Sequence, residues 1–248
     1  MLPDFVQYFL FIGMVAFMFL LRLDAKRFSA AEWDTQDGDW RVWLGRISWY
    51  AAGLGLALNI FALYRSPVSE LNLQLGADRA EGMVYGLLFG GAGIVAAFIL
   101  AILRNGRISF PAPGRYPGGV LTAVGTAFFD EWLFRGVLLG LLLTLGLPDW
   151  LAVVGAAFIY AFTVRAGTGS RGIFTLGLWL AIGLVGGALV ITTVGIAAAL
   201  VGHAITRFAL FMVMGPPERA AVEQVHEPKG GTGDSGAYVI RPHDARRG

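Results

Sequence analysis

The sequence predicts an all-α fold, a polytopic transmembrane helical bundle of about seven spans with its N-terminus outside and its C-terminus in the cytoplasm. Three observations predict it: the composition, the lengths of the apolar segments and the placement of the basic residues. Of the 248 residues, 56% are hydrophobic and 15% are charged, whereas about 25% are charged in a typical soluble domain. The mean hydropathy is +0.65. Because a soluble domain of this length cannot bury so much apolar sequence, we expect a lipid bilayer to surround most of the chain.

Seven apolar segments each come close to the roughly 20 residues that a helix needs to cross the hydrocarbon core. They are residues 5–21, 43–64, 83–103, 120–145, 150–164, 173–191 and 193–214. The last two form one continuous apolar run, which we divide at Thr192 and Thr193 because a single helix of that length would overshoot the bilayer. We therefore expect three N-terminal spans within 1–116, a four-span core over 117–214 and a flexible cytoplasmic tail over 215–248.

The basic residues support this order of spans. Cytoplasmic loops are normally rich in Lys and Arg, and with the N-terminus outside, the outer loops carry only Arg65 and Arg79. The expected cytoplasmic loops and tail hold Arg22, Lys26, Arg27, Arg41, Arg104, Arg107, Arg115, Arg165, Arg171, Arg219, Lys229, Arg241, Arg246 and Arg247. Since these residues serve topology and the net charge is only +2, the sequence does not predict a nucleic-acid partner.

The spacing of the glycines predicts close helix packing, and the lack of cysteine excludes several kinds of site. Glycines recur at four-residue spacing in three segments, at Gly82, Gly86 and Gly90, at Gly136 and Gly140, and at Gly183 and Gly187. This spacing lets transmembrane helices pack closely. We expect packing within the bundle, and dimerisation through such faces is the alternative. With no cysteine in the chain, a disulfide framework, a thiol nucleophile and a cysteine-ligated metal are excluded.

Five titratable or charged residues lie deep inside the spans. They are Asp130, Glu131 and Arg135 in the fourth and His203 and Arg207 in the seventh. Both groups lie about 16 Å from the cytoplasmic ends of their segments at ~1.5 Å per residue, so they meet if the two spans are neighbours. Glu131 and Arg135 share a helix face, and Asp130 is rotated from Glu131 so that one acid pairs with arginine while the other faces a cavity.

Two interpretations of this cluster remain open from the residues alone. A charge at the centre of a bilayer costs about 2.5–3.5 kcal/mol on insertion scales, so intramembrane charges usually mark a functional site. The structural interpretation is a buried ion-pair network that only fixes the helix register. A proton-coupled carrier is a further alternative, although the sequence lacks the internal repeats typical of such carriers.

At these residues the sequence resembles a known family. The stretch 129–136, Phe-Asp-Glu-Trp-Leu-Phe-Arg-Gly, resembles the acid-Glu-x-x-Phe-Arg-Gly motif of the CAAX prenyl protease and bacteriocin-processing (CPBP, or Abi) membrane proteins. His203 matches the histidine of the family's third motif, where Arg207 replaces an Asn or Asp. In the second motif, Phe-x-x-x-His, Phe158 is followed by Phe162 in place of the histidine. The resemblance covers about residues 117–214.

The resemblance implies an intramembrane endopeptidase that acts on a lipid-anchored, prenylated or membrane-embedded peptide, in a bacterial cytoplasmic membrane. It implies that Asp130 activates the water, with Glu131 beside it, that Arg135 orients the acids and that His203 donates to the oxyanion. Arg207 stands where it either strengthens the oxyanion site or pairs with Asp130. The incomplete motifs leave open a catalytically degenerate relative with a bacteriocin-immunity, regulatory or binding role.

A metal site is the remaining question for these residues. Asp130, Glu131 and His203 together offer the three protein ligands of a zinc site. Because the second-motif histidine is absent, we expect neither a divalent metal nor another cofactor.

Overall fold

The structure is a computed structural model that describes residues 4–28, 30, 40–63, 67–106, 108, 110–168 and 172–214. Within these ranges all regular elements are helical, which confirms the all-α prediction. The long helices are α1 (Asp4–Leu23), α2 (Trp40–Leu63), α4 (Arg79–Asn105), α5 (Tyr116–Asp130), α7 (Asp149–Thr168), α8 (Ile173–Thr193) and α9 (Ala197–Met214). The shorter elements are η1 (Ala25–Phe28), α3 (Pro67–Glu70), η2 (Pro113–Arg115), the π-helical segment η3 (Glu131–Leu138) and α6 (Leu139–Thr144). The expected tail over 215–248 lies outside the described residues.

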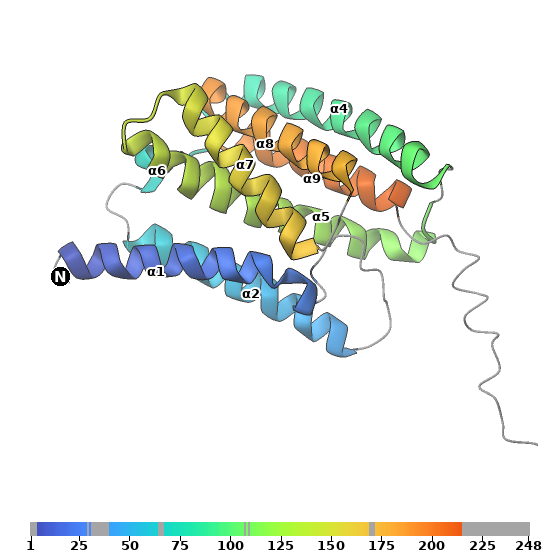
Figure 1. Cartoon of the computed structure of the whole chain (residues 1–248), viewed down its shortest axis with the longest axis horizontal. Helices are drawn as coiled ribbons and strands as arrows, with labels where there is room; N and C mark the ends of the chain where they lie inside the picture. The colour runs from blue at the N-terminus through green and yellow to red at the C-terminus, as the bar shows by residue number, and fades with distance from the viewer. Residues whose placement is uncertain are drawn as a thin grey trace, which may run out of the picture.

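The helices form a bundle in which α5 and η3 are covered on both sides. In Figure 1, α1 and α2 lie side by side along one side of the molecule, and α4, α8 and α9 lie on the other. Between them runs the path of α5, η3 and α6, and α7 crosses beside it. Residues far apart in the sequence therefore meet around the junction of α5 and η3.

Six described helices are long and apolar enough to cross a membrane, judged by length and composition. They run over Phe5–Leu23, Trp40–Leu63, Arg79–Leu103, Asp149–Gly167, Ile173–Thr193 and Ala197–Met214, and they correspond to six of the seven predicted spans. The predicted fourth span, 120–145, lies, except for its last residue, in an unbroken helical run over residues 116–144. That run changes from α- to π-helical hydrogen bonding at Glu131, so neither part of it is long enough by itself.

The division of the last apolar run is confirmed. Helix α8 ends at Thr193, and Val194 adopts a left-handed conformation with φ 53° and donates its N–H to the carbonyl of Val190. This is a common way to satisfy the last carbonyls of a helix. The turn is held by the segment before α4, because the N–H of Ile196 donates to the carbonyl of Gln74 at 3.0 Å. The helix therefore breaks at Val194, two residues after Thr192.

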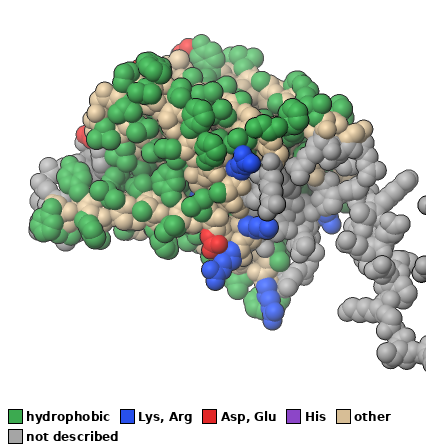
Figure 2. All heavy atoms as spheres, viewed as in Figure 1, with side chains coloured by type: hydrophobic (Ala, Val, Ile, Leu, Met, Phe, Trp, Pro, Cys, Tyr) green, Lys and Arg blue, Asp and Glu red, His purple; other side chains and the backbone are tan. Residues whose placement is uncertain are grey.

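The surface agrees with a lipid environment. Large hydrophobic side chains such as Phe5, Phe9 and Leu88 are more than 60% exposed. Figure 2 shows a face covered mostly by hydrophobic side chains, with a few basic ones gathered toward one edge. A soluble protein rarely exposes so large a continuous apolar surface, whereas a helical bundle in a bilayer requires it.

Most of the spaced glycines serve contacts within the chain. A Cβ atom at Gly90 would lie 2.8 Å from Ile205 of α9, and one at Gly86 would lie 3.0 Å from the Cβ of Val201. At Gly82 a Cβ would meet nothing within 4 Å. The other glycines of these motifs also lie against neighbouring elements, namely Gly136, Gly140, Gly183 and Gly187. Close packing inside the bundle therefore uses this spacing, and dimerisation stays a prediction.

Replacing Gly90 with Ala should lower the apparent melting temperature in detergent, because the new methyl group overpacks the α4–α9 contact at a cost of about 1–3 kcal/mol. Gly91→Ala is the matched control, since Gly91 is exposed on the same helix and a Cβ there meets nothing within 4 Å. The control should melt at or above the wild-type temperature, because Ala favours a helix over Gly by about 1 kcal/mol. Equal melting temperatures for the two variants would contradict the α4–α9 contact.

Candidate active site

The five residues predicted from the sequence meet in one buried cluster. Asp130 ends α5, Glu131 and Arg135 lie in η3, and His203 and Arg207 lie one turn apart on α9. All five are at most 4% exposed. The prediction that two groups at matched depth meet between neighbouring helices is therefore confirmed.

Glu131 and His203 form a direct contact between η3 and α9. The Oε1 atom of Glu131 lies 2.6 Å from Nδ1 of His203 and 3.3 Å from Nη1 of Arg135. The pairing of Glu131 with Arg135 agrees with their predicted common face. The other carboxylate oxygen, Oε2, is buried and has no hydrogen-bond partner among the described residues. Glu131 also opens a π-helical segment, and such segments are frequent at functional sites. This oxygen is therefore the candidate proton acceptor of the cluster.

The hydrogen bonds fix the proton on His203. Nε2 of its ring receives a hydrogen bond from Nε of Arg207 at 2.8 Å, and the hydroxyl of Tyr160 lies 3.1 Å away. A guanidinium only donates hydrogen bonds, so Nε2 must be an acceptor and the ring proton must lie on Nδ1, which donates to Glu131. The ring then has no N–H left for an oxyanion, and the donors beside it are Arg207 and Tyr160.

Asp130 is enclosed by two guanidinium groups. Arg22 of α1 donates from Nε to Oδ1 at 2.6 Å and from Nη2 to Oδ2 at 3.2 Å, and Arg207 donates from Nη2 to Oδ2. The expectation that one acid faces a cavity is therefore wrong for Asp130, since arginines occupy both of its oxygens. Glu131, not Asp130, retains an available oxygen. Arg207 pairs with Asp130, which is one of the two roles that the sequence left open for it.

Three residues of the cluster were missed by the sequence analysis. Arg22 was interpreted as a topology signal in a cytoplasmic loop, yet it is 0% exposed. Tyr160 and Trp179 carry no signal in the sequence that distinguishes them from the many other aromatic residues of the apolar segments. The guanidinium of Arg135 lies 4.2 Å from the centre of the Tyr160 ring, and that of Arg207 lies 5.2 Å from the centre of the Trp179 ring. Aromatic faces thus supply part of the compensation for the buried cations.

Helix α7 presents a different face from the one expected. Phe162, which was predicted to stand at the position of the missing histidine, is 54% exposed, and Phe158 is 46% exposed. Tyr160 and Val164, which are also four residues apart, are both 0% exposed. The residue of α7 that contacts the cluster is therefore Tyr160, and Val164 lies one turn further along on the same buried face. Which residue of α7 aligns with the second-motif histidine stays a prediction, because a Phe-x-x-x pattern does not say which helix face is buried.

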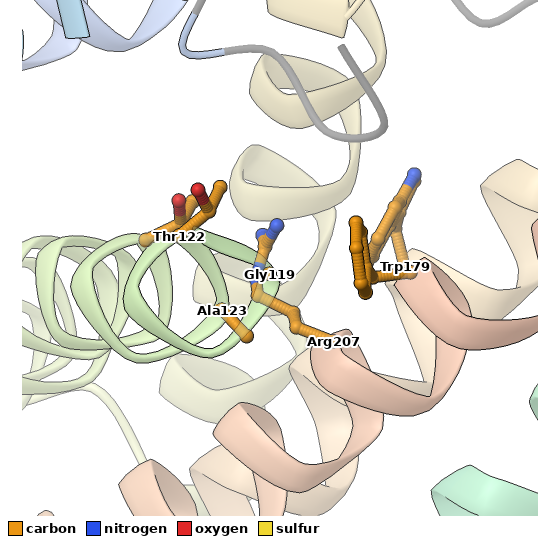
Figure 3. A pocket seen from close by; sticks show the side chains of 7 residues that line it. Gly119, Thr122, Ala123, Trp179 and Arg207 are labelled. Atoms are coloured by element: carbon orange, nitrogen blue, oxygen red, sulfur yellow. The ribbon is translucent and has the colours of Figure 1, made fainter. Parts of the chain in front are cut away.

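A small pocket reaches the cluster between α5, α8 and α9. It has a volume of about 30 Å³ and is lined by Gly119, Thr122, Ala123, Thr126, Trp179, Arg207 and Phe211. In Figure 3 the Arg207 side chain extends between Thr122 of α5 and the indole of Trp179. The volume and the polar groups suit a single water molecule. Arg207 is thus a residue that this pocket shares with the cluster.

The donor set does not fit a metal ion. Guanidinium groups occupy both oxygens of Asp130, and His203 is bonded at Nδ1 by Glu131 and at Nε2 by Arg207. Among the described residues, no three side chains of His, Cys, Asp or Glu converge as metal ligands. Three nearby cationic guanidinium groups further oppose a divalent cation.

One comparison with known proteins identifies a family over the core of the chain. Residues 113–209 match the model of the family described as type II CAAX prenyl endopeptidase Rce1-like. No curated protein and no solved structure matches the chain. The match confirms the resemblance inferred from the motif around Asp130, and it includes Glu131 and His203 but not α1. With its apolar helices, it indicates an integral membrane protein of the CAAX-protease type.

Replacing Asp130 with Ala should destabilise the protein strongly, because it leaves Arg22 and Arg207 buried without their shared counter-charge. Breaking a buried ion pair in this way costs about 3–5 kcal/mol. Asp24→Ala is the control, since its 3.7 Å contact with Arg27 is exposed and such surface pairs contribute about 0–1 kcal/mol. Thermal unfolding in detergent measures both variants, and a loss no larger for Asp130 than for Asp24 would contradict the assigned network.

Proposed function

We propose that this chain is an intramembrane endopeptidase that hydrolyses a peptide bond of a lipid-anchored, prenylated or membrane-embedded substrate. The observation that carries the proposal is the Glu131–His203 pair, in which one carboxylate oxygen is fixed by the imidazole and the other is buried without a partner in the part of the chain that the structure describes. The family match over 113–209 supports the class of reaction.

In the proposed mechanism Glu131 is the general base. Its free Oε2 accepts a proton from a water molecule while the water oxygen attacks the carbonyl carbon of the peptide bond. Glu131 then gives the proton to the leaving amine as the C–N bond breaks. His203, with its proton on Nδ1, holds the carboxylate in place for both transfers.

Arg207 and Tyr160 are the proposed donors for the oxyanion. Both already direct hydrogen-bond donors toward Nε2 of His203, so a carbonyl oxygen placed beside this atom meets a guanidinium and a phenol O–H. Donors preorganised in a water-poor site stabilise developing negative charge far better than they do in water. Asp130 and Arg135 have supporting roles in this proposal: Asp130 anchors the guanidinium of Arg207, and Arg135 pairs with Glu131 and donates to the carbonyl of Ile182 at 3.0 Å.

The membrane arrangement of the proposal follows the predicted topology. The helical run over 116–144 is the fourth of seven spans, with the N-terminus outside and the C-terminus in the cytoplasm of a bacterial cell. The cluster then lies below the cytoplasmic surface, where the small pocket at Arg207 gives water its route. A non-cleaving regulatory or immunity role on the same scaffold is the alternative, which the family match does not favour and which cleavage assays exclude or establish.

Glu131→Gln should abolish cleavage while the protein stays folded. Gln keeps an oxygen that accepts from His203 but cannot take a proton from water, and loss of a general base costs about 10²–10⁴-fold in rate. The measurement is mass spectrometry of prenylated and unmodified peptides incubated with protein in liposomes. Glu81→Gln, at an exposed position in the first turn of α4, is the control and should cleave normally. Normal cleavage by Glu131→Gln would refute this assignment of the base.

Val164→His should raise the cleavage rate, and Phe162→His should not. Position 164 lies on the buried face of α7 one turn after Tyr160, so we expect an imidazole there to reach the cluster and to help activate water, whereas one at position 162 is exposed. The same liposome assay compares the two variants. A gain for Phe162→His without a gain for Val164→His would show that the buried face of α7 is assigned wrongly.

A further inference from the structure

Arg22 belongs to the cluster although it lies far from the matched segment. It lies in the last turn of α1, is 0% exposed and donates two hydrogen bonds to Asp130, at 2.6 and 3.2 Å. Its backbone is held from two sides. The indole N–H of Trp49 donates to the carbonyl of Leu21 at 2.8 Å, and Gly167 of α7 packs so tightly against the carbonyl of Arg22 that a Cβ does not fit there. The end of α1 is therefore fixed where it presents this guanidinium to Asp130.

A continuous series of hydrogen bonds leads from Arg22 to Glu131. Oδ2 of Asp130 accepts hydrogen bonds from both Arg22 and Arg207. Nε of Arg207 donates to Nε2 of His203, and Nδ1 of His203 donates to Glu131. Because Arg207 uses one nitrogen for Asp130 and another for His203, the orientation of the Asp130 carboxylate sets the plane of this guanidinium. That plane in turn decides which nitrogen of His203 carries the proton.

We infer that Arg22 is a positioning residue, which holds Asp130 and Arg207 so that His203 keeps its proton on Nδ1 and directs it to Glu131. Without Arg22, the Asp130 carboxylate is free to take both terminal donors of Arg207, the preferred bidentate geometry of such pairs. Nε of Arg207 then no longer donates to His203, and no hydrogen bond favours one tautomer of the ring over the other. Helix α1, outside the matched residues 113–209, thereby completes the site. The catalytic consequence rests on the proposed function, whereas the effect on His203 does not.

Nitrogen NMR of the histidine ring tests the inference without any substrate. The chain has three histidines, so the double substitution His226→Gln and His243→Gln leaves His203 as the only one in protein labelled with ¹⁵N-histidine. We expect one protonated Nδ1 signal and one unprotonated Nε2 signal. Arg22→Gln should replace them with the averaged signals of two exchanging tautomers. Arg22→Lys, which keeps the charge but not the forked donors, should fall between these two results.

Two further variants separate positioning from a loss of folding. Arg27→Gln is the control, because its side chain is 80% exposed in the same region of the chain, and it should leave the His203 signals unchanged. Asp130→Asn already breaks the series, so adding Arg22→Gln to it should change the signals no further. The double variant removes both charges of the Arg22–Asp130 pair. Additive effects of these substitutions, or unchanged His203 signals in folded Arg22→Gln protein, would overturn the inference.

Cleavage kinetics supply the catalytic consequence. If the wild-type protein cleaves a peptide, Arg22→Gln should lower kcat about 10²-fold, as misplaced catalytic groups typically do, and leave KM unchanged. A rise in KM at constant kcat would overturn the positioning role, since it assigns Arg22 to substrate binding. A wild-type protein that cleaves no peptide refutes the proposed function, and the NMR signals still decide whether Arg22 positions His203.

Discussion

Burial of ionised groups in a surrounding of lipid is the constraint on which this structure depends. A guanidinium or carboxylate placed inside a bilayer must find its partners within the protein, because the hydrocarbon offers none. Asp130 meets this need with Arg22 and Arg207, and Glu131 meets it with Arg135 and His203. Since the partners come from α1, η3 and α9, the depth and rotation of several helices are set together. Such networks contribute more to a defined helix register than to net stability.

Close helix packing makes this compensation geometrically feasible. Charged side chains on neighbouring helices can form ion pairs only if the two helix backbones lie no further apart than an arginine side chain can reach. Gly86 and Gly90 bring α4 against α9, and Gly202 of α9 packs against the ring of Phe89. At Gly186 of α8 a Cβ would lie 3.1 Å from Nε of Arg135, so the absence of a side chain there leaves space for the guanidinium. The small residues and the charged residues therefore belong to one packing arrangement.

The same network concentrates the available chemistry on few atoms. Guanidinium groups saturate Asp130, and His203 is bonded at both ring nitrogens, so within the described residues Oε2 of Glu131 is the acidic oxygen of the cluster without a hydrogen-bond partner. A buried oxygen without a partner costs about 1–3 kcal/mol, so a water molecule or a substrate group suits this place. The type II CAAX prenyl endopeptidase match covers this residue.

The sequence was sufficient for the class of fold and for five of the charged or titratable residues of the cluster, although not for Arg22. The thickness of a bilayer imposes a length on each apolar run, and charges within such runs are rare enough to be conspicuous. Matching depths even predicted that Glu131 and His203 meet, because the rise of a helix per residue is constant. The break after Thr193 followed from the same rule of length.

Only the tertiary structure decided which of these residues pair and which oxygen stays free. Arg22 directly follows an apolar run, and in a sequence such an arginine is indistinguishable from a charge that marks the cytoplasmic side. Phe162 and Val164 differ in burial because of the helices packed on α7, and no local pattern on α7 records those neighbours. The roles of Asp130 and Glu131 likewise depend on side chains contributed by α1 and α9. Hydropathy and spacing describe one helix at a time, whereas the pairing of buried charges is a property of several helices packed together.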